Sequence, residues 1–290
     1  MWLQLALDTT ITWLLYSLAA SGFHLASTCC RHFAFAAGMA FITAPLLLWS
    51  TLGWSGMSLS AAIALGSCIC LGAGYCRLAA VLRVKGCRGT QLLIISLALL
   101  AASENLAIML TGAASVSLWD KPSAVVLSTD RLVITRQLLT VLVSCAAGVL
   151  CLWLVWSRSL LGIALRALFE SRWNLALRGY NVRLLETIGT AFGFGILGVA
   201  GILWASLLRV RPVMGFDIAV LGVAAVLAAP LIKPGFPGVV WSCMGIVVIR
   251  LALSLYFDGD WNLTAILLFL ILIAAFTAPR AVLRQISAAQ

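Results

Sequence analysis

Residues 164–181 read ALRALFESRWNLALRGYN and lie at the centre of a polar stretch, Arg158 to Glu186, in a chain that is otherwise almost entirely apolar. The stretch holds Glu170 and five arginines, which are Arg158, Arg166, Arg172, Arg178 and Arg183. Uncharged runs on both sides are each close to the ~20 residues that cross a bilayer. The stretch is therefore predicted to be a solvated, helix-prone connection between two spans, of a length that suggests a binding partner outside the bilayer.

The composition identifies the class of protein. Of the 290 residues, 63% are hydrophobic and only 10% are charged, whereas soluble domains are roughly a quarter charged. Helices satisfy their own backbone hydrogen bonds in lipid, and a barrel would instead show short alternating strands. The sequence predicts an all-α, polytopic helical membrane protein with one transmembrane domain, residues 1–290.

Apolar runs bounded by charges or turn residues predict about eight or nine transmembrane helices. Their approximate ranges are Thr9–Ala26, Phe33–Leu52, Leu59–Leu82, Gln91–Thr111, Val133–Trp156, Thr187–Leu208, Phe216–Ile232, Gly238–Tyr256 and Leu263–Ala278. The seventh is short and is followed by a turn rich in proline and glycine, so a re-entrant or broken segment is an alternative to a full span there.

Basic residues are shared unevenly between the two sets of connecting loops. One set holds Arg31, Arg83, Lys85, Arg88, the five arginines of the polar stretch, Lys233, Arg280 and Arg284. The opposite set holds six aspartates and fewer cations. The positive-inside rule therefore predicts that the polar stretch and the C-terminus are cytoplasmic and that the N-terminus is outside. The first cation, Arg31, follows the first predicted span, so a cleaved signal peptide is not expected.

Nucleotide and metal sites are not expected in this chain. Gly193, Gly195 and Gly198 match the dinucleotide-binding spacing, but they lie inside an uncharged run without the preceding strand that this site requires. With Gly189 they are expected to form a smooth face for helix packing. No lysine follows a glycine, so no P-loop is present. The nine cysteines include no Cys-x-x-Cys pair, and the sequence predicts no metal, cofactor or catalytic residue.

Glu104 is an ionisable residue well inside a predicted span, with Asn105 beside it. A charge near the bilayer centre costs about 2.5–3.5 kcal/mol on insertion scales, so its side chain should face protein or water. Two interpretations stay open. Glu104 lines a transport pathway, or it is protonated and forms a helix–helix hydrogen bond.

The polar stretch has the pattern of one amphipathic helix. Its apolar face is predicted to contain Leu165, Leu168, Phe169, Trp173 and Ala176. Gly179 is expected to end the helix and Asn181 to lie in the following turn. Two roles fit such a helix: it lies on anionic lipid, or a soluble partner binds it.

The same stretch resembles the cytoplasmic coupling segment of ABC importer permeases for branched-chain amino acids, a family that also includes urea and amide importers. Arg166-Ala167, Glu170, Gly179 and Asn181 match the Arg-Ala-x-x-Glu start and Gly-x-Asn end of that segment at the same spacing. Residues 32–38, 86–112, 211–216 and 278–283 are similar to further family elements in the same order. The chain departs from the family where Ala228-Ala229-Pro230 replaces a glycine-rich run.

The resemblance implies a permease subunit of a bacterial inner-membrane importer, working by alternating access. Its partners would be a second permease chain, two ATPase subunits that bind ATP and Mg, and an extracytoplasmic solute-binding protein. The cargo would be a branched-chain or other small amino acid, or a small amide such as urea. The residues that contact the ATPase would be Arg166, Ala167, Glu170, Arg172, Trp173, Arg178, Gly179 and Asn181, and the candidate pathway residues are Glu104, Asn105, Phe33 and Gly38.

Two other classes of protein remain as alternatives. An ion-coupled secondary transporter would carry several ionisable groups at mid-span, whereas Glu104 is the clear example here. A membrane enzyme would cluster catalytic groups at one face, which two histidines and scattered carboxylates do not support.

Overall fold

The computed structural model describes residues 2–112, 114–115, 117–118, 125–129, 132–232, 235–256 and 264–272. Its elements, in chain order, are α1 (Trp2–Cys30), α2 (Ala37–Val84), α3 (Gly89–Thr111), β1 (Val125–Thr129), β2 (Leu132–Thr135), α4 (Arg136–Arg158), α5 (Leu160–Glu170), α6 (Arg172–Leu177), α7 (Val182–Leu207), α8 (Met214–Ile232) and α9 (Phe236–Tyr256). Residues 264–272 are also helical. The helical membrane fold is confirmed, with one antiparallel hairpin, β1–β2, between α3 and α4 that the sequence did not indicate.

Within the described part of the chain, six helical segments are long and apolar enough to cross a bilayer. They are Gly56–Val84, Gly89–Thr111, Arg136–Arg158, Val182–Leu207, Met214–Ile232 and Phe236–Leu255. The first predicted span lies within α1, the second matches the shorter apolar helix Ala37–Leu52, and the ninth begins in 264–272 and continues outside the described residues. The seventh is continuous from Met214 to Ile232 although it contains Pro230, so the structure shows no break there.

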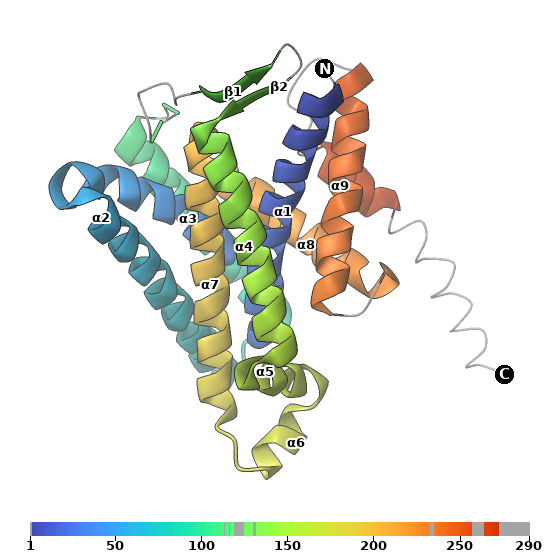
Figure 1. Ribbon diagram of the computed structural model, residues 1–290. Coiled ribbons are helices and arrows are strands. Elements are labelled where there is room, and N and C mark those ends of the chain that lie inside the picture. Colours follow the sequence, from blue (N-terminus) through green and yellow to red (C-terminus); the bar gives the residue numbers. More distant parts are fainter. Residues whose placement is uncertain are drawn as a thin grey trace.

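The second and third predicted spans are the two halves of α2, which bends sharply (Figure 1). The bend is at Gly56, where φ is +70° and ψ is 166°. This backbone conformation is accessible to glycine and strained for other residues.

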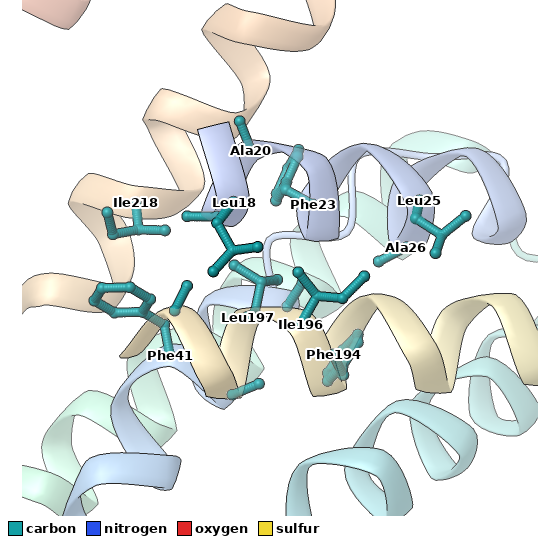
Figure 2. Close-up of a cluster of buried hydrophobic side chains, with 14 of the residues drawn as sticks. Leu18, Ala20, Phe23, Leu25, Ala26, Phe41, Phe194, Ile196, Leu197 and Ile218 are labelled. Atoms are coloured by element: carbon teal, nitrogen blue, oxygen red, sulfur yellow. The ribbon is translucent and has the colours of Figure 1, made fainter. Parts of the chain in front are cut away.

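Helix α7 is the centre of the bundle and packs against α1 and α2. Figure 2 shows Leu18 of α1 beside Ile196 and Leu197 of α7, with Ile218 of α8 at the edge of the cluster. Phe23 and Leu197 are completely buried. These contacts bury apolar side chains. The core helices have apolar residues on all sides, so the sequence pattern does not indicate which residues meet which partner helix.

Small residues allow α7 to approach its neighbours closely. A β-carbon on Gly193 would lie 2.7 Å from the carbonyl oxygen of Gly22 and 2.9 Å from the backbone nitrogen of Ala26. One on Gly198 would lie 3.0 Å from Cys68 Sγ, and Gly189 faces the Cys29 sulfur in the same way. Gly189, Gly193 and Gly198, three of the glycines expected to form a packing face, therefore lie at helix contacts.

The two ends of the bundle differ in structure (Figure 1). The hairpin and the N-terminus lie at one end, called the hairpin end below. Helices α5 and α6 lie at the opposite end, called the α6 end. The N-terminus and the polar stretch are therefore on opposite sides of the bundle.

Candidate functional site

The polar stretch forms two helices where the sequence suggested one. Ser171 interrupts the helix with an extended backbone, φ −158° and ψ 105°, between α5 and α6. Its hydroxyl accepts a hydrogen bond from the Asn174 backbone N–H at 3.3 Å and caps α6, as Ser159 caps α5 through Gly162 at 3.0 Å. The prediction of a single amphipathic helix was wrong because this capping serine starts a new helix within it.

Gly179 ends α6 as expected, with a φ of +81°. The Gly179 N–H donates to the Ala176 carbonyl at 3.0 Å and the Tyr180 N–H to the Leu175 carbonyl at 3.3 Å. This pair of bonds is the Schellman motif that closes many helices at a glycine. Asn181 then caps α7, because its side-chain oxygen accepts from the Leu184 N–H at 3.2 Å.

The apolar face of the stretch differs from the predicted one at Trp173 and Ala176. Leu165 and Leu168 are buried as expected, but Trp173 is 75% exposed, Ala176 is also exposed, and Leu175 is buried in α6 instead. The new start at Ser171 shifts the helical register, which turns Trp173 outward. Further large apolar side chains that are exposed in and next to the stretch are Leu160, Leu161, Ile163, Leu177, Tyr180 and Leu184.

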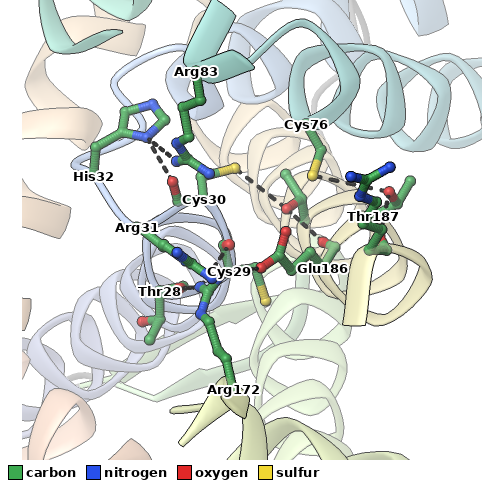
Figure 3. Close-up of polar contacts among 12 residues, drawn as sticks. Thr28, Cys29, Cys30, Arg31, His32, Cys76, Arg83, Arg172, Glu186 and Thr187 are labelled. Atoms are coloured by element: carbon green, nitrogen blue, oxygen red, sulfur yellow. Dashed lines mark hydrogen bonds and ion pairs between the residues drawn. The ribbon is translucent and has the colours of Figure 1, made fainter. Parts of the chain in front are cut away.

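Arg172 holds α6 against the bundle (Figure 3). Its guanidinium donates to the Glu186 carboxylate on α7 and to the carbonyls of Thr28 and Cys29 on α1, both at 3.1 Å. The last carbonyls of a helix lack partners within the helix and attract cations. Burial first, and the nearby Arg31 cation second, lower the pKa of Arg172 to about 10, so it is charged at neutral pH.

The other residues predicted to contact an ATPase lie in several environments. Arg166 is exposed and donates to the carbonyls of Gly162 and Ser157 at 3.4 and 3.5 Å. Ala167 is half-buried, and Arg178 is exposed at the end of α6. The Glu170 side chain lies outside the described part of the chain. The exposed set therefore centres on Arg166, Trp173 and Arg178, while Arg172 is directed inward.

Glu186 is a central residue of this region that the sequence analysis did not select. Its carboxylate contacts Arg172 and lies 3.5 Å from the Arg31 guanidinium. The sequence could have indicated Glu186, since it is the acidic residue at the end of the polar stretch. Basic residues from separate loops line an open recess of about 490 Å³ around it, namely Arg31, Arg83, Arg172 and Arg183. Among the described residues, cations of three of the loops grouped by charge, namely Arg31, Arg83 and two arginines of the polar stretch, thus converge at the α6 end.

His32 lies beside this recess and joins α1 to α2. Its Nδ1 is 2.7 Å from the Cys30 carbonyl oxygen, and its Nε2 is 2.5 Å from the Tyr75 hydroxyl. Burial lowers the pKa of His32, the bond to the Cys30 carbonyl raises it, and the Arg83 cation at 3.2 Å lowers it further. The net pKa is below its ordinary value, so the neutral ring is favoured.

Two of the four candidate pathway residues, Glu104 and Gly38, meet the start of α8. Glu104 accepts a hydrogen bond from the Phe216 N–H at 2.8 Å, in the first turn of α8. A β-carbon on Gly38 would lie 2.6 Å from the neighbouring Gly215 carbonyl oxygen. Glu104 therefore forms a helix–helix hydrogen bond, as in the second interpretation, but it is the acceptor of a backbone N–H that has no partner within its own helix, and this bond does not require the protonated form.

The other two, Asn105 and Phe33, form hydrogen bonds with residues of α3. Asn105 donates to the Ala101 carbonyl of its own helix at 2.8 Å, and the Phe33 carbonyl accepts from Ser96 Oγ at 3.4 Å. A role for any of the four in transport stays a prediction.

A polar cavity of about 360 Å³ lies towards the hairpin end, where α1, α7, α8 and α9 meet. Its lining includes Tyr16, Trp204, Arg209, Arg211, Asp217 and Arg250. Neither Trp204 nor Arg250 was selected from the sequence. An arginine inside an apolar run is itself a signal of function in membrane proteins, so Arg250 was detectable.

Comparisons with known proteins give a likeness of fold. No family model matches the chain, and no curated protein matches it. The solved structure of PsaBC from Streptococcus pneumoniae in complex with Fab is similar with a TM-score of 0.53 and 12% sequence identity, over 92% of this chain and 89% of that chain. The two chains share an overall helical arrangement, and at this identity the likeness is one of fold alone.

Proposed function

We propose that the chain is the permease subunit of an ATP-binding-cassette importer, and that α5 and α6 are its coupling segment. The observation that carries the proposal is that α6 is fixed to the bundle and yet exposes its surface. Arg172 ties α6 to α1 and α7, while Trp173 is 75% and Leu177 is 70% exposed. A displacement imposed on Trp173 by a partner would pass directly to two helices of the core.

The exposed surface of α6 suits a protein partner better than a lipid surface. Tryptophan, tyrosine and arginine are the residues enriched at protein interfaces and their binding hot spots. Trp173 is exposed at the start of α6, and Arg178 and Tyr180 are exposed directly after its end. A helix lying on lipid would direct an apolar face into the bilayer, whereas α6 buries Leu175 in the protein and exposes the polar Asn174 next to Trp173.

The other subunits of the transporter would be separate chains. This chain has no P-loop, so ATP and Mg would bind to two ATPase subunits docked at the α6 end. A second permease chain would complete the pathway, and a solute-binding protein would deliver cargo at the hairpin end. The fold shared with PsaBC supports the permease role. We place the protein in a bacterial inner membrane with its N-terminus outside.

The cargo that we propose is a branched-chain or other small amino acid. It rests on the resemblance of Arg166-Ala167, Glu170, Gly179 and Asn181 to the coupling segment of that importer family. A small amide such as urea is the second candidate within the same family.

The docking role is tested by co-purification of the ATPase in mild detergent. Trp173→Ala is expected to remove most of the bound ATPase, because exposed interface tryptophans often account for 2 kcal/mol or more, roughly thirtyfold in affinity. Trp49→Ala, an exposed tryptophan of α2, is the matched control and should retain the ATPase. Equal recovery with both variants would refute the docking role.

The transport role is tested by reconstitution in vesicles with radiolabelled L-leucine. Uptake should require ATP and the separate ATPase chain. Uptake driven by an ion gradient through this chain alone would instead establish the secondary transporter.

A further inference from the structure

The cavity at the hairpin end combines opposite charges with an aromatic wall. We propose that it is a binding site for an apolar α-amino acid in its zwitterionic form. The proposal rests on the transport function proposed above and adds the place and the groups that hold the cargo.

The charged groups come from two helices that approach each other across the cavity. Asp217 lies in the first turn of α8 and Arg250 lies on α9. Both are half-buried, and Arg250 donates from Nη1 to Thr12 Oγ1 on α1 at 3.4 Å, which fixes its position. A carboxylate ligand suits a guanidinium, and an ammonium suits a carboxylate, through charge-assisted hydrogen bonds. The cavity thus offers one group for each end of a zwitterion.

Trp204 supplies a second, independent indication of a ligand. Its side chain lines the cavity and is 8% exposed, and its indole Nε1 is buried without a hydrogen-bond partner among the described residues. A buried tryptophan N–H normally has an acceptor, because an unsatisfied buried donor is costly. A ligand carboxylate next to Arg250 would provide that acceptor.

The remaining wall is apolar and rigid. The rings of Tyr16 and Trp204 are stacked with centroids 5.8 Å apart and an angle of 8°, and Phe41 meets Trp204 edge-on at 6.1 Å. Ile218 and Leu221 complete the apolar lining from α8. The volume of about 360 Å³ is within the range of about 300–1,000 Å³ that is typical of small-molecule pockets. An aliphatic side chain fits this wall, while urea has no group that would use it.

The exposed guanidiniums of Arg209 and Arg211 lie at the mouth, on the loop between α7 and α8. Cations at the mouth raise the local concentration of carboxylates. The ligand carboxylate would then move to Arg250 and Trp204, its ammonium to Asp217, and its side chain to the aromatic wall.

The site is tested by direct binding to the complete chain, purified with its partner subunits in lipid nanodiscs. The three probes are L-leucine, 4-methylpentanoate, which lacks the ammonium, and 3-methylbutylamine, which lacks the carboxylate. We expect L-leucine to bind at least about tenfold more tightly than either analogue, since each omits one charged hydrogen bond.

Variants of the lining residues test which residue binds each end of the ligand. Asp217→Asn should weaken L-leucine about tenfold or more and leave 4-methylpentanoate unchanged. Arg250→Gln should weaken L-leucine and 4-methylpentanoate and leave 3-methylbutylamine unchanged. Trp204→Phe keeps the ring and removes the N–H, so it should weaken both carboxylates severalfold even if Arg250→Gln does not fold. Arg136→Gln, an exposed arginine at the same end of the bundle, is the control and should bind as the wild type does.

Two results would overturn the site. One is wild-type protein that binds 4-methylpentanoate as tightly as L-leucine, which would make the cavity a simple anion site. The other is an Asp217→Asn variant with unchanged L-leucine binding. The docking role is judged separately, because retention of the ATPase by these cavity variants is measured in the same purification.

Discussion

The Arg172 guanidinium and the Glu186 carboxylate meet across the junction of α6 and α7, and the same guanidinium binds the last carbonyls of α1. Both side chains are largely buried, at 17% and 13% exposure. One residue of the polar stretch therefore fixes the stretch to the core, and its neighbour Trp173 is left exposed.

The two residues are expected to act as one unit. Arg172→Ala and Glu186→Ala should each lower the thermal stability of the detergent-solubilised protein, because each leaves a largely buried group without its partner. The double variant should be more stable than the sum of the two losses predicts, by about 0.5–3 kcal/mol. Melting curves of the four proteins measure this coupling, and strictly additive losses would show that the contact is incidental.

His32 should make stability depend on pH. Its pKa is lowered in the folded protein, mainly by burial, so the folded state binds protons less readily than the unfolded state. The stabilisation is complete above the unfolded pKa of about 6.5 and is lost as the pH falls towards the folded pKa.

Melting temperatures between pH 8 and pH 5 test this dependence. His32→Gln, which keeps hydrogen-bonding groups but cannot titrate, should flatten the curve in this range relative to the wild type. A decline of the same steepness in His32→Gln would assign the pH dependence to other groups.

Gly193→Ala should destabilise the bundle. Its β-carbon would lie 2.7 Å from the Gly22 carbonyl oxygen, so α1 and α7 must separate, and overpacking of this kind costs about 1–3 kcal/mol. The control is Gly66→Ala in α2, where a β-carbon meets nothing within 4 Å. Thermal unfolding should show a loss for Gly193→Ala and none for Gly66→Ala, and equal effects would contradict the packing role.

Gly179→Ala should weaken ATPase binding more than it lowers overall stability. The position has open space but a φ of +81°, so alanine introduces backbone strain of about 1–2 kcal/mol and loosens the end of α6. Gly179→Asn should be milder, since asparagine tolerates this conformation better. Recovery of the ATPase with each variant measures the effect, and the order wild type, Asn, Ala is the expected one.

Much of the fold follows from local patterns. Apolar runs predict the spans. Gly179 and Asn181 mark the end of α6 and the start of α7, because where a helix ends or begins depends on residues within one turn. Ser171 shows the limit of this approach. A capping serine inside an amphipathic pattern divides the helix, and whether it does so depends on what its flanking helices pack against.

The residues that share the cavity could not be predicted from sequence patterns. Asp217, Arg250 and Trp204 lie on three helices, and neither periodicity nor spacing relates them to one another. Glu104 illustrates the same limit, since its partner is a backbone N–H at Phe216, which carries no sequence signal.

The sequence by itself determined that this chain is a helical membrane protein with a basic stretch outside the bilayer, because hydropathy and charge are properties of each segment alone. Only the tertiary structure decided that Arg172 is directed inward and Trp173 outward, and that Asp217, Arg250 and Trp204 share a cavity. These facts depend on how apolar helices pack together. When a helix is apolar on every side, its sequence contains little information about which side meets which neighbour.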